Sequence, residues 1–376
     1  MRGTGVSLPT PASSRVRAPE LWGARPTAWI LTVVVSLVLV VSTGTNARAT
    51  TSDPLYSKQW GLSQVRAEAA WARSRGTGTL IGIVDSGINL AHPDLATKVV
   101  SGNTFLGCGA RGCGNGDWLS GPAARRSSAS PHGTHVAGIA GALTGNGRGI
   151  AGVAPGAKVL AVKVLDEQGG SFADIGLGIR YAADRGAKVI NLSLGALPGV
   201  QALTITGAVR DVTSAIAYAN AKGALVLAAA GNESAPLCDT PGFDPGAVCV
   251  AATDKREAHS FYSNFAVRPD LVAVSAPGGS ALPVCGEDVV STMPAGSTTN
   301  PCRYPVGYDE LAGTSMATPH VSGVAALLMA QGRTRYGALK ALTSTARHPG
   351  TGTRGVYDPV YGYGIVDAAA AVAAPR

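Results

Sequence analysis

Short, uniformly apolar runs that alternate with longer segments of helical periodicity constrain the fold of this chain most strongly. Strands that are apolar throughout are buried on both faces, as in parallel sheets covered by helices on each side. We expect strands at Thr79–Val84, Lys158–Leu165, Lys188–Ser193, Ala224–Ala229, Val248–Ala252 and Leu271–Ser275. We expect helices at His135–Leu143, Phe172–Arg185, Ile205–Lys222, Thr314–Gln331 and Tyr336–Thr345. This pattern predicts an α/β fold with a doubly wound, mostly parallel sheet and a functional crevice beyond the carboxyl ends of its strands.

The first 49 residues are typical of an export signal. Arginines precede the apolar run Ala28–Val41, and Ala47-Arg48-Ala49 offers a small-x-small cleavage site. The run is shorter than the ~20 residues of a spanning helix, although an uncleaved membrane anchor remains an alternative. We expect a signal peptide at 1–49, secretion, no stable membrane association after cleavage, and one domain at 50–376.

The basic balance of the chain does not indicate nucleic-acid binding. The first 49 residues hold five arginines and one glutamate, so they contribute +4 of the net charge of +8. The remainder contains no run of Lys and Arg interleaved with aromatic residues, which a polyanion-binding surface would need.

The six cysteines agree with an oxidising compartment, because their number is even and all follow Ala49. Six cysteines allow 15 pairings. They form three neighbouring couples in Gly/Pro-rich segments, for which we expect local disulfides: Cys108/Cys113, Cys238/Cys249 and Cys285/Cys302. A zinc site would need closer Cys-x-x-Cys or Cys/His spacing.

Three polar residues stand at the edges of expected elements in the order Asp, His, Ser. Asp85 directly follows the first strand, His132 stands where a helix is expected to start, and Ser315 lies at the start of a strongly apolar helix. Each alone has an ordinary reading, as a turn residue, a structural histidine or a helix N-cap. Together they supply a nucleophile, a base that takes its proton, and a carboxylate that orients the base.

The segments around these residues resemble the three signature segments of the subtilisin-like serine proteases. They read IVDSGI at Asp85, HGTHVAG from His132 and GTSMATPH around Ser315, in the chain order of that family. Similarity runs from YSKQWGL, which begins at Tyr56, to GYGIVD, which ends at Asp367. The resemblance implies a serine endopeptidase that hydrolyses polypeptide substrates through an acyl-enzyme intermediate, without a catalytic cofactor and as a monomer.

The resemblance also implies an oxyanion donor and a substrate cleft. Asn232, after AAAG, matches the amide that stabilises the oxyanion. Ser193, Leu194 and Gly195 match one backbone edge of the cleft, and Gly169, Gly170 and Ser171 match the opposite edge. Ala230 and Gly231 match a wall of the first specificity pocket, which we expect to suit apolar side chains.

A structural calcium ion is a further implication of the resemblance. Asp53, Asp94 and Asn146 match side-chain ligands in some relatives, and Leu143, Arg148 and Ile150 fall where backbone carbonyls complete the site. Oxygen donors of this kind suit calcium. However, the loop is rich in glycine and carries the cation of Arg148.

The sequence departs from the family where secreted relatives usually carry a folding pro-domain. Asp53-Pro54-Leu55-Tyr56, which resembles the mature start, follows Ala49 almost at once. We therefore expect folding without an attached pro-domain. Two alternatives in function remain. One is a catalytically inactive relative that acts as a binding module, and the other is an α/β-hydrolase, whose Gly-x-Ser-x-Gly motif and chain order do not match.

Overall fold

The computed structural model describes residues 51–121, 129–196, 209–267, 270–297 and 301–376. The compact unit 48–376 contains all of them, and the expected signal peptide lies outside the described residues. Among the described residues no helix is both long enough and apolar enough to cross a bilayer.

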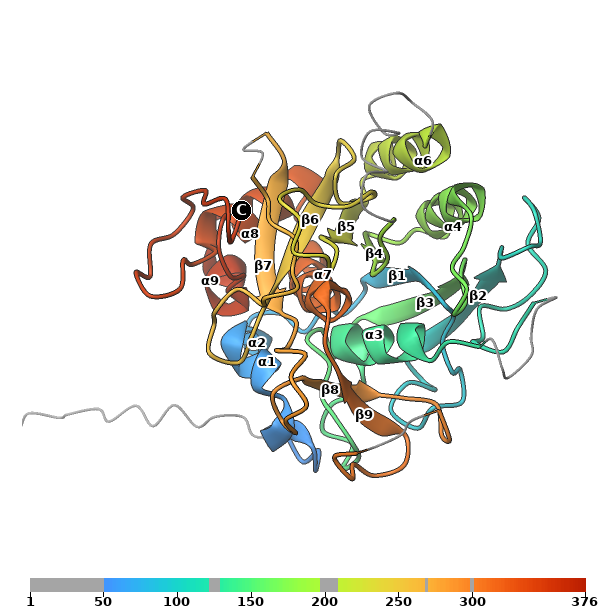
Figure 1. Cartoon of the computed structure of the whole chain (residues 1–376), viewed down its shortest axis with the longest axis horizontal. Helices are drawn as coiled ribbons and strands as arrows, with labels where there is room; N and C mark the ends of the chain where they lie inside the picture. The colour runs from blue at the N-terminus through green and yellow to red at the C-terminus, as the bar shows by residue number, and fades with distance from the viewer. Residues whose placement is uncertain (1–50, 122–128, 197–208, 268–269, 298–300) are drawn as a thin grey trace, which may run out of the picture. The chain divides into compact units, whose positions relative to one another are not determined.

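A parallel sheet of seven strands forms the centre of this unit (Figure 1). Its order is β2-β3-β1-β4-β5-β6-β7, and every neighbouring pair is parallel. The strands are β1 (Leu80–Asp85), β2 (Val99–Thr104), β3 (Lys158–Lys163), β4 (Val189–Leu192), β5 (Leu225–Ala229), β6 (Ala247–Thr253) and β7 (Val272–Pro277). The expected α/β class with a parallel sheet is therefore confirmed.

Helices cover both faces of this sheet, which explains why its strands are apolar throughout. On one face, α4 (Phe172–Asp184) and α6 (Arg210–Ala221) pack on side chains such as Val162 and Ile190. On the other face, α3 (His132–Gly141) and α7 (Thr314–Ala330) pack on alternate residues such as Ile83 and Leu227. The helices α8 (Arg335–Thr345), α1 (Trp60–Gln64), α2 (Ala67–Trp71) and α9 (Ala368–Ala373) complete that second layer.

The helix α7 is buried on all sides, because it lies between the sheet and α3. Its sequence is apolar around the whole circumference, as expected for a helix inside a core. Pro319 is the sixth residue of α7 and has no N–H for the carbonyl of Ser315, which accepts instead from Ser193 Oγ at 2.8 Å. The N-terminus of this buried helix carries Ser315.

Several elements were not expected from the sequence. The edge strand β2 reads VVSGNT and pairs irregularly with β3, and the antiparallel hairpin of β8 (Val289–Thr292) and β9 (Tyr308–Leu311) was missed. The expected helix 135–143 begins at His132, three residues earlier. Of the expected helix 205–222, residues 205–208 lie outside the described residues, and α6 covers 210–221.

Candidate functional site

The carboxylate of Asp85 lies at the carboxyl end of β1 and is fully buried. Its Oδ1 accepts hydrogen bonds from His132 Nδ1 at 2.8 Å and from the backbone N–H of Ser86 at 2.6 Å. His132 is the first residue of α3, and its side chain is 27% exposed. The imidazole thus has one ring nitrogen fixed by a buried carboxylate, while part of the ring reaches solvent.

The start of α3 is tied directly to the end of β1. Ser86 Oγ accepts from Gly133 N at 2.9 Å and donates to Ser130 O at 3.0 Å. A methyl group on Gly133 would lie 2.4 Å from Gly87 O, so only glycine permits this approach. These contacts hold His132 against Asp85.

The electrostatics separate His132 from His135 and His320, the other histidines of the segments HGTHVAG and GTSMATPH. Burial works to lower the pKa of His132, but the charge of Asp85 and its hydrogen bond outweigh burial and raise that pKa above 6.5. Burial lowers the pKa of His135 to about 3 and of His320 to about 4. The last two are therefore neutral core residues, and His132 is the imidazole poised to change its charge near neutral pH.

Ser315 lies in the first turn of α7, beside the end of β4. Its Oγ donates to Ser193 O at 3.2 Å, and Ser193 Oγ in turn donates to Ser315 O at 2.8 Å. Between the described residues His132 and Ser315 there is no hydrogen bond in this conformation. The structure therefore joins His132 to Asp85 and Ser315 to the segment after β4.

Asn232 follows β5 and adjoins the same helix start. Its Oδ1 accepts from Thr314 N at 2.9 Å, which leaves the Nδ2 amide group as its donor. A methyl group on Gly313 would lie 3.6 Å from Ser315 N and 3.7 Å from Asn232 Nδ2. Since Gly313 has no side chain, and its φ of 152° disfavours one, the space between these two N–H donors stays open.

The segments expected to form a cleft border a cavity of about 370 Å³. Gly169 and Gly170 line it from one side, and Leu194 and Gly195 line it from the other. Ser171 lies just outside, where its Oγ caps α4 by accepting from Asp174 N at 3.0 Å. Phe172 and Ile175 add apolar surface to the cavity, and neither was anticipated from the sequence.

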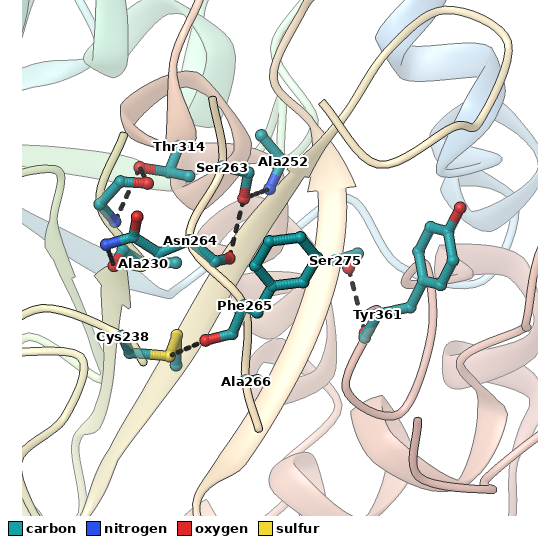
Figure 2. The surroundings of a disulfide bond; sticks show 12 residues. Ala230, Cys238, Ala252, Ser263, Asn264, Phe265, Ala266, Ser275, Thr314 and Tyr361 are labelled. Carbon is teal, nitrogen blue, oxygen red and sulfur yellow. Dashed lines mark hydrogen bonds between the residues drawn. A yellow bond between two sulfur atoms is a disulfide. The ribbon is translucent and has the colours of Figure 1, made fainter. Parts of the chain in front are cut away.

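Asn264 is a residue of this region that the sequence analysis missed. It is fully buried, and its Nδ2 donates to Ala230 O at 3.0 Å (Figure 2). The same Nδ2 donates to Glu233 Oε2 at 3.0 Å. Its Oδ1 accepts from the backbone N–H groups of Glu233 and Ala235. These four hydrogen bonds fix the turn that carries Asn232. The sequence around Asn264 contains no motif from which this role could have been predicted.

The residues expected to bind calcium come together but hold one another by hydrogen bonds. Asp53 accepts from the backbone N–H groups of Gly145 and Asn146, and Asn146 Oδ1 accepts from Arg148 N at 2.9 Å. The last bond turns the amide nitrogen of Asn146 toward Asp94 Oδ1, at 2.8 Å. The other oxygen of Asp94 accepts from Ile150 N and Tyr308 Oη, at 3.0 and 2.9 Å.

The backbone carbonyls of Leu143, Arg148 and Ile150 accept no hydrogen bond from the described residues, whereas the side chains of the set do. Each side-chain oxygen that would face the cation already accepts an N–H or O–H of the chain, and Leu143 contributes its N–H to Asp94 O. The hydroxyl of Tyr308, in the hairpin of β8 and β9, donates a hydrogen bond to Asp94. The sequence did not predict this hairpin. A carboxylate oxygen that accepts one hydrogen bond keeps a further lone pair, so the calcium site stays a prediction.

The hydrogen bonds of Asp94 with Asn146 and Tyr308 predict, against the resemblance, that removal of calcium leaves thermal stability unchanged. Melting curves of the purified protein in EDTA and in millimolar calcium should coincide. Tyr308→Phe, which deletes the O–H donor, should lower the free energy of unfolding by about 1–2 kcal/mol in both buffers. A rise in melting temperature with calcium that Asp94→Asn abolishes would contradict this prediction.

Three disulfides join the neighbouring cysteine couples: Cys108–Cys113, Cys238–Cys249 and Cys285–Cys302. Glu310 lies beside Cys285 and Cys302, close enough for the three to resemble a metal cluster. Both cysteines are oxidised, however, so they offer no thiolate to a metal.

Comparisons with known proteins point to one family. Residues 76–364 match the model of the subtilase family. Thermitase of Thermoactinomyces vulgaris is 41% identical over 307 residues, which cover 81% of this chain and 94% of that protein. An extracellular protease of Xanthomonas campestris is 35% identical over 88% of this chain and 58% of its own length. A solved structure of a Pseudoalteromonas arctica protease superposes with a TM-score of 0.71 at 32% identity, and the match covers 86% of this chain and 99% of that structure.

Proposed function

We propose, since this chain belongs to the subtilase family of serine peptidases, that it cuts polypeptides with Asp85, His132 and Ser315 as its catalytic triad. The observation that carries the proposal is the hydrogen bond between His132 and the buried carboxylate of Asp85, near a helix start that presents a serine hydroxyl. Family membership accounts for the type of enzyme, and this geometry supports the assignment of the residues.

In the proposed mechanism, His132 takes the proton of Ser315 as the hydroxyl attacks the scissile carbonyl. The hydroxyl, which now donates to Ser193 O, first turns toward Nε2 of His132, as catalytic hydrogen bonds often form only with substrate bound. Asp85 keeps the proton on Nδ1 and stabilises the imidazolium that forms. His132 then gives its proton to the leaving amine, and water hydrolyses the acyl-enzyme by the same steps in reverse order.

The oxyanion of the tetrahedral intermediate would lie in the space that Gly313 leaves open. Ser315 N–H and Asn232 Nδ2 border that space from two sides. Donors that are fixed before the reaction lower the barrier because they need no reorganisation as charge develops. Asn264 supports this role indirectly, since it fixes the turn that holds Asn232.

An extended polypeptide would bind by strand addition between the segments 193–195 and 169–171. The apolar surface of Phe172, Ile175 and Leu194 would take a substrate side chain at some distance from the cut bond. No catalytic cofactor is required, because the serine, the imidazole and the amide donors supply the chemistry.

We further propose that residues 1–49 are a signal peptide and that the enzyme acts outside the cell. The three disulfides support an oxidising compartment. The likeness to a protein named extracellular protease points the same way. Mass spectrometry of the protein recovered from the medium should find an N-terminus at Thr50, and an intact Met1 would contradict cleavage.

The test of function is labelling and hydrolysis with the same preparation. Full-length protein, expressed by an oxidising secretory route, should react with a fluorophosphonate at Ser315 and should hydrolyse casein. A folded protein that neither reacts nor hydrolyses casein would instead support an inactive binding module.

The pH dependence of kcat/KM follows from the raised pKa of His132. The imidazole must be neutral to accept a proton, so activity should be lost as the pH falls through a value above 6.5. Asp85→Asn removes the charge that raises this pKa and should move the acid limb to lower pH. Rates on a chromogenic peptide between pH 5 and 9 measure the acid limbs of the parent and of Asp85→Asn. An acid limb of the parent below the pKa of free histidine would contradict the assignment.

A further inference from the structure

Two neighbouring segments at the carboxyl edge of the sheet are the walls that the family resemblance implies for the first specificity pocket, here called the slot. β4 and β5 are paired in parallel with Leu192 opposite Ala228, and the chain continues beyond them as Ser193–Gly195 and Ala230–Gly231. Ser315 contacts the first segment, and Asn232 directly follows the second. A side chain that enters this slot from the substrate therefore belongs to the residue at the bond under attack.

Residues 239 and 240 close the bottom of this slot. Asp239 N donates to Ala230 O at 2.7 Å, and Ala196 N donates to Thr240 O at 2.9 Å. One short stretch of backbone is thus bonded to both walls. The disulfide from Cys238 to Cys249 in β6 anchors that stretch to the sheet, next to Asn264 and Ala230 (Figure 2).

The carboxylate of Asp239 faces both walls from this position. A methyl group on Gly231 would lie 2.4 Å from Asp239 Oδ2, and one on Gly195 would lie 3.3 Å from the same oxygen. Because both walls are glycine here, neither wall places a side chain of its own in front of the carboxylate, and the amide of Asn264 lies beside it. Asp239 is 1% exposed, so its charge is largely removed from water.

A second carboxylate adds negative charge at the same wall. Glu233 Oε2 would lie 2.7 Å from a methyl group on Gly231, and the amide of Asn264 holds it there. Two carboxylates therefore flank the glycine that the sequence analysis assigned to an apolar pocket. The polar floor could not be foreseen, because Asp239 lies in a loop between Cys238 and Thr240 without a recognisable motif.

We propose that Asp239 makes this enzyme prefer substrates with lysine or arginine on the acyl side of the cut bond. The inference rests on the proposed function and names its substrate class. A carboxylate shielded from water attracts a cation strongly and repels an acidic side chain, and an acidic floor is an established way for a protease pocket to select basic residues.

The first experiment compares peptides that differ only in charge at this position. Chromogenic peptides with lysine and with norleucine have side chains of similar length, and arginine and citrulline form a second pair. The protein should cleave the charged member of each pair with a kcat/KM roughly 10²-fold higher, the order expected of a buried charge pair. Equal rates, or faster cleavage of norleucine and citrulline, would overturn the proposal.

The second experiment removes the charge from the floor. Asp239→Asn should lower the lysine-to-norleucine ratio of kcat/KM at least about 10-fold. Asp244→Asn is the matched control, because Asp244 is a buried acid of the same loop whose carboxylate bonds to Thr213. The control should keep the ratio of the parent, and an unchanged ratio in Asp239→Asn would refute the assignment.

Failure of this inference can be told from failure of the proposed function. Fluorophosphonate labelling of Ser315 reports whether each variant has a folded site, and the paired peptides decide the question on the parent even if Asp239→Asn does not fold. Hydrolysis of the neutral peptides without preference for the charged ones would refute the role of Asp239 alone. A folded parent that cleaves no peptide and is not labelled would refute the proposed function itself.

Discussion

Replacing Ser315 by alanine should lower kcat on casein or a peptide substrate by about 10⁶-fold, a magnitude taken from another member of the family. The remaining hydroxyl groups near the site cannot substitute, since Ser193 Oγ is bonded to Ser315 O and to Asn191 Nδ2. The oxyanion donors remain, so a trace of catalysis above the uncatalysed rate should persist. A stopped assay with long incubation measures the loss.

Ser322→Ala is the matched control for this change. Ser322 lies in the same helix α7 and is fully buried, but its Oγ donates to Asn191 Oδ1 at 2.8 Å. Its loss should lower the free energy of unfolding by about 1 kcal/mol while kcat changes only a few-fold. Retention of more than a hundredth of the activity by Ser315→Ala would exclude Ser315 as the nucleophile.

Asp85→Asn should lower kcat by about 10⁴-fold without displacing His132. The amide offers an N–H toward Nδ1, which favours the imidazole tautomer with its proton on Nε2 and leaves no base for the serine. The lost charge also ceases to stabilise the imidazolium. Steady-state rates of the purified variant, with its circular dichroism spectrum as a check on folding, test this expectation.

Asp254→Asn provides the comparison for the aspartate. Asp254 lies at the carboxyl end of β6, in the way that Asp85 lies at the carboxyl end of β1. Its Oδ1, however, accepts hydrogen bonds from the backbone N–H groups of Arg256 and Ala258. This variant should keep its activity within a few-fold. A loss below about 10-fold in Asp85→Asn would show that the carboxylate does not orient the base.

The sheet could be predicted because its inner strands are buried on both faces. Such strands leave uninterrupted apolar runs, and all strands of the large sheet except β2 were located from them. β2 lies at the edge, where its partly exposed residues include Ser101 and Asn103, so it carries no such run. The helices α1 and α2 have five residues each, too few for a helical period to show.

The candidate site was predictable where chemistry requires particular residues at the ends of elements. The motifs located Asp85, His132, Ser315 and Asn232, and the structure brings Asp85 to His132 and Asn232 to the start of α7. The polarity of the specificity slot was not predictable, because it depends on how the loop that carries Asp239 packs against Gly195 and Gly231. The hydrogen bond from the Tyr308 hydroxyl to Asp94 was not predictable either, since the two residues lie 214 positions apart in the chain.

Because α7 is buried on all sides, Ser315, the proposed nucleophile, reaches its working position only once the chain has folded. Until the sheet and α3 close around this helix, Ser315 N–H and Asn232 have no fixed separation and cannot hold an oxyanion. Copies that are still unfolded are then harmless to one another, yet each is a flexible chain that any completed copy can cut. The rate at which folded copies cut unfolded copies should therefore grow with the product of the two concentrations. Folding that is rapid, or that takes place at low protein concentration, should protect the yield.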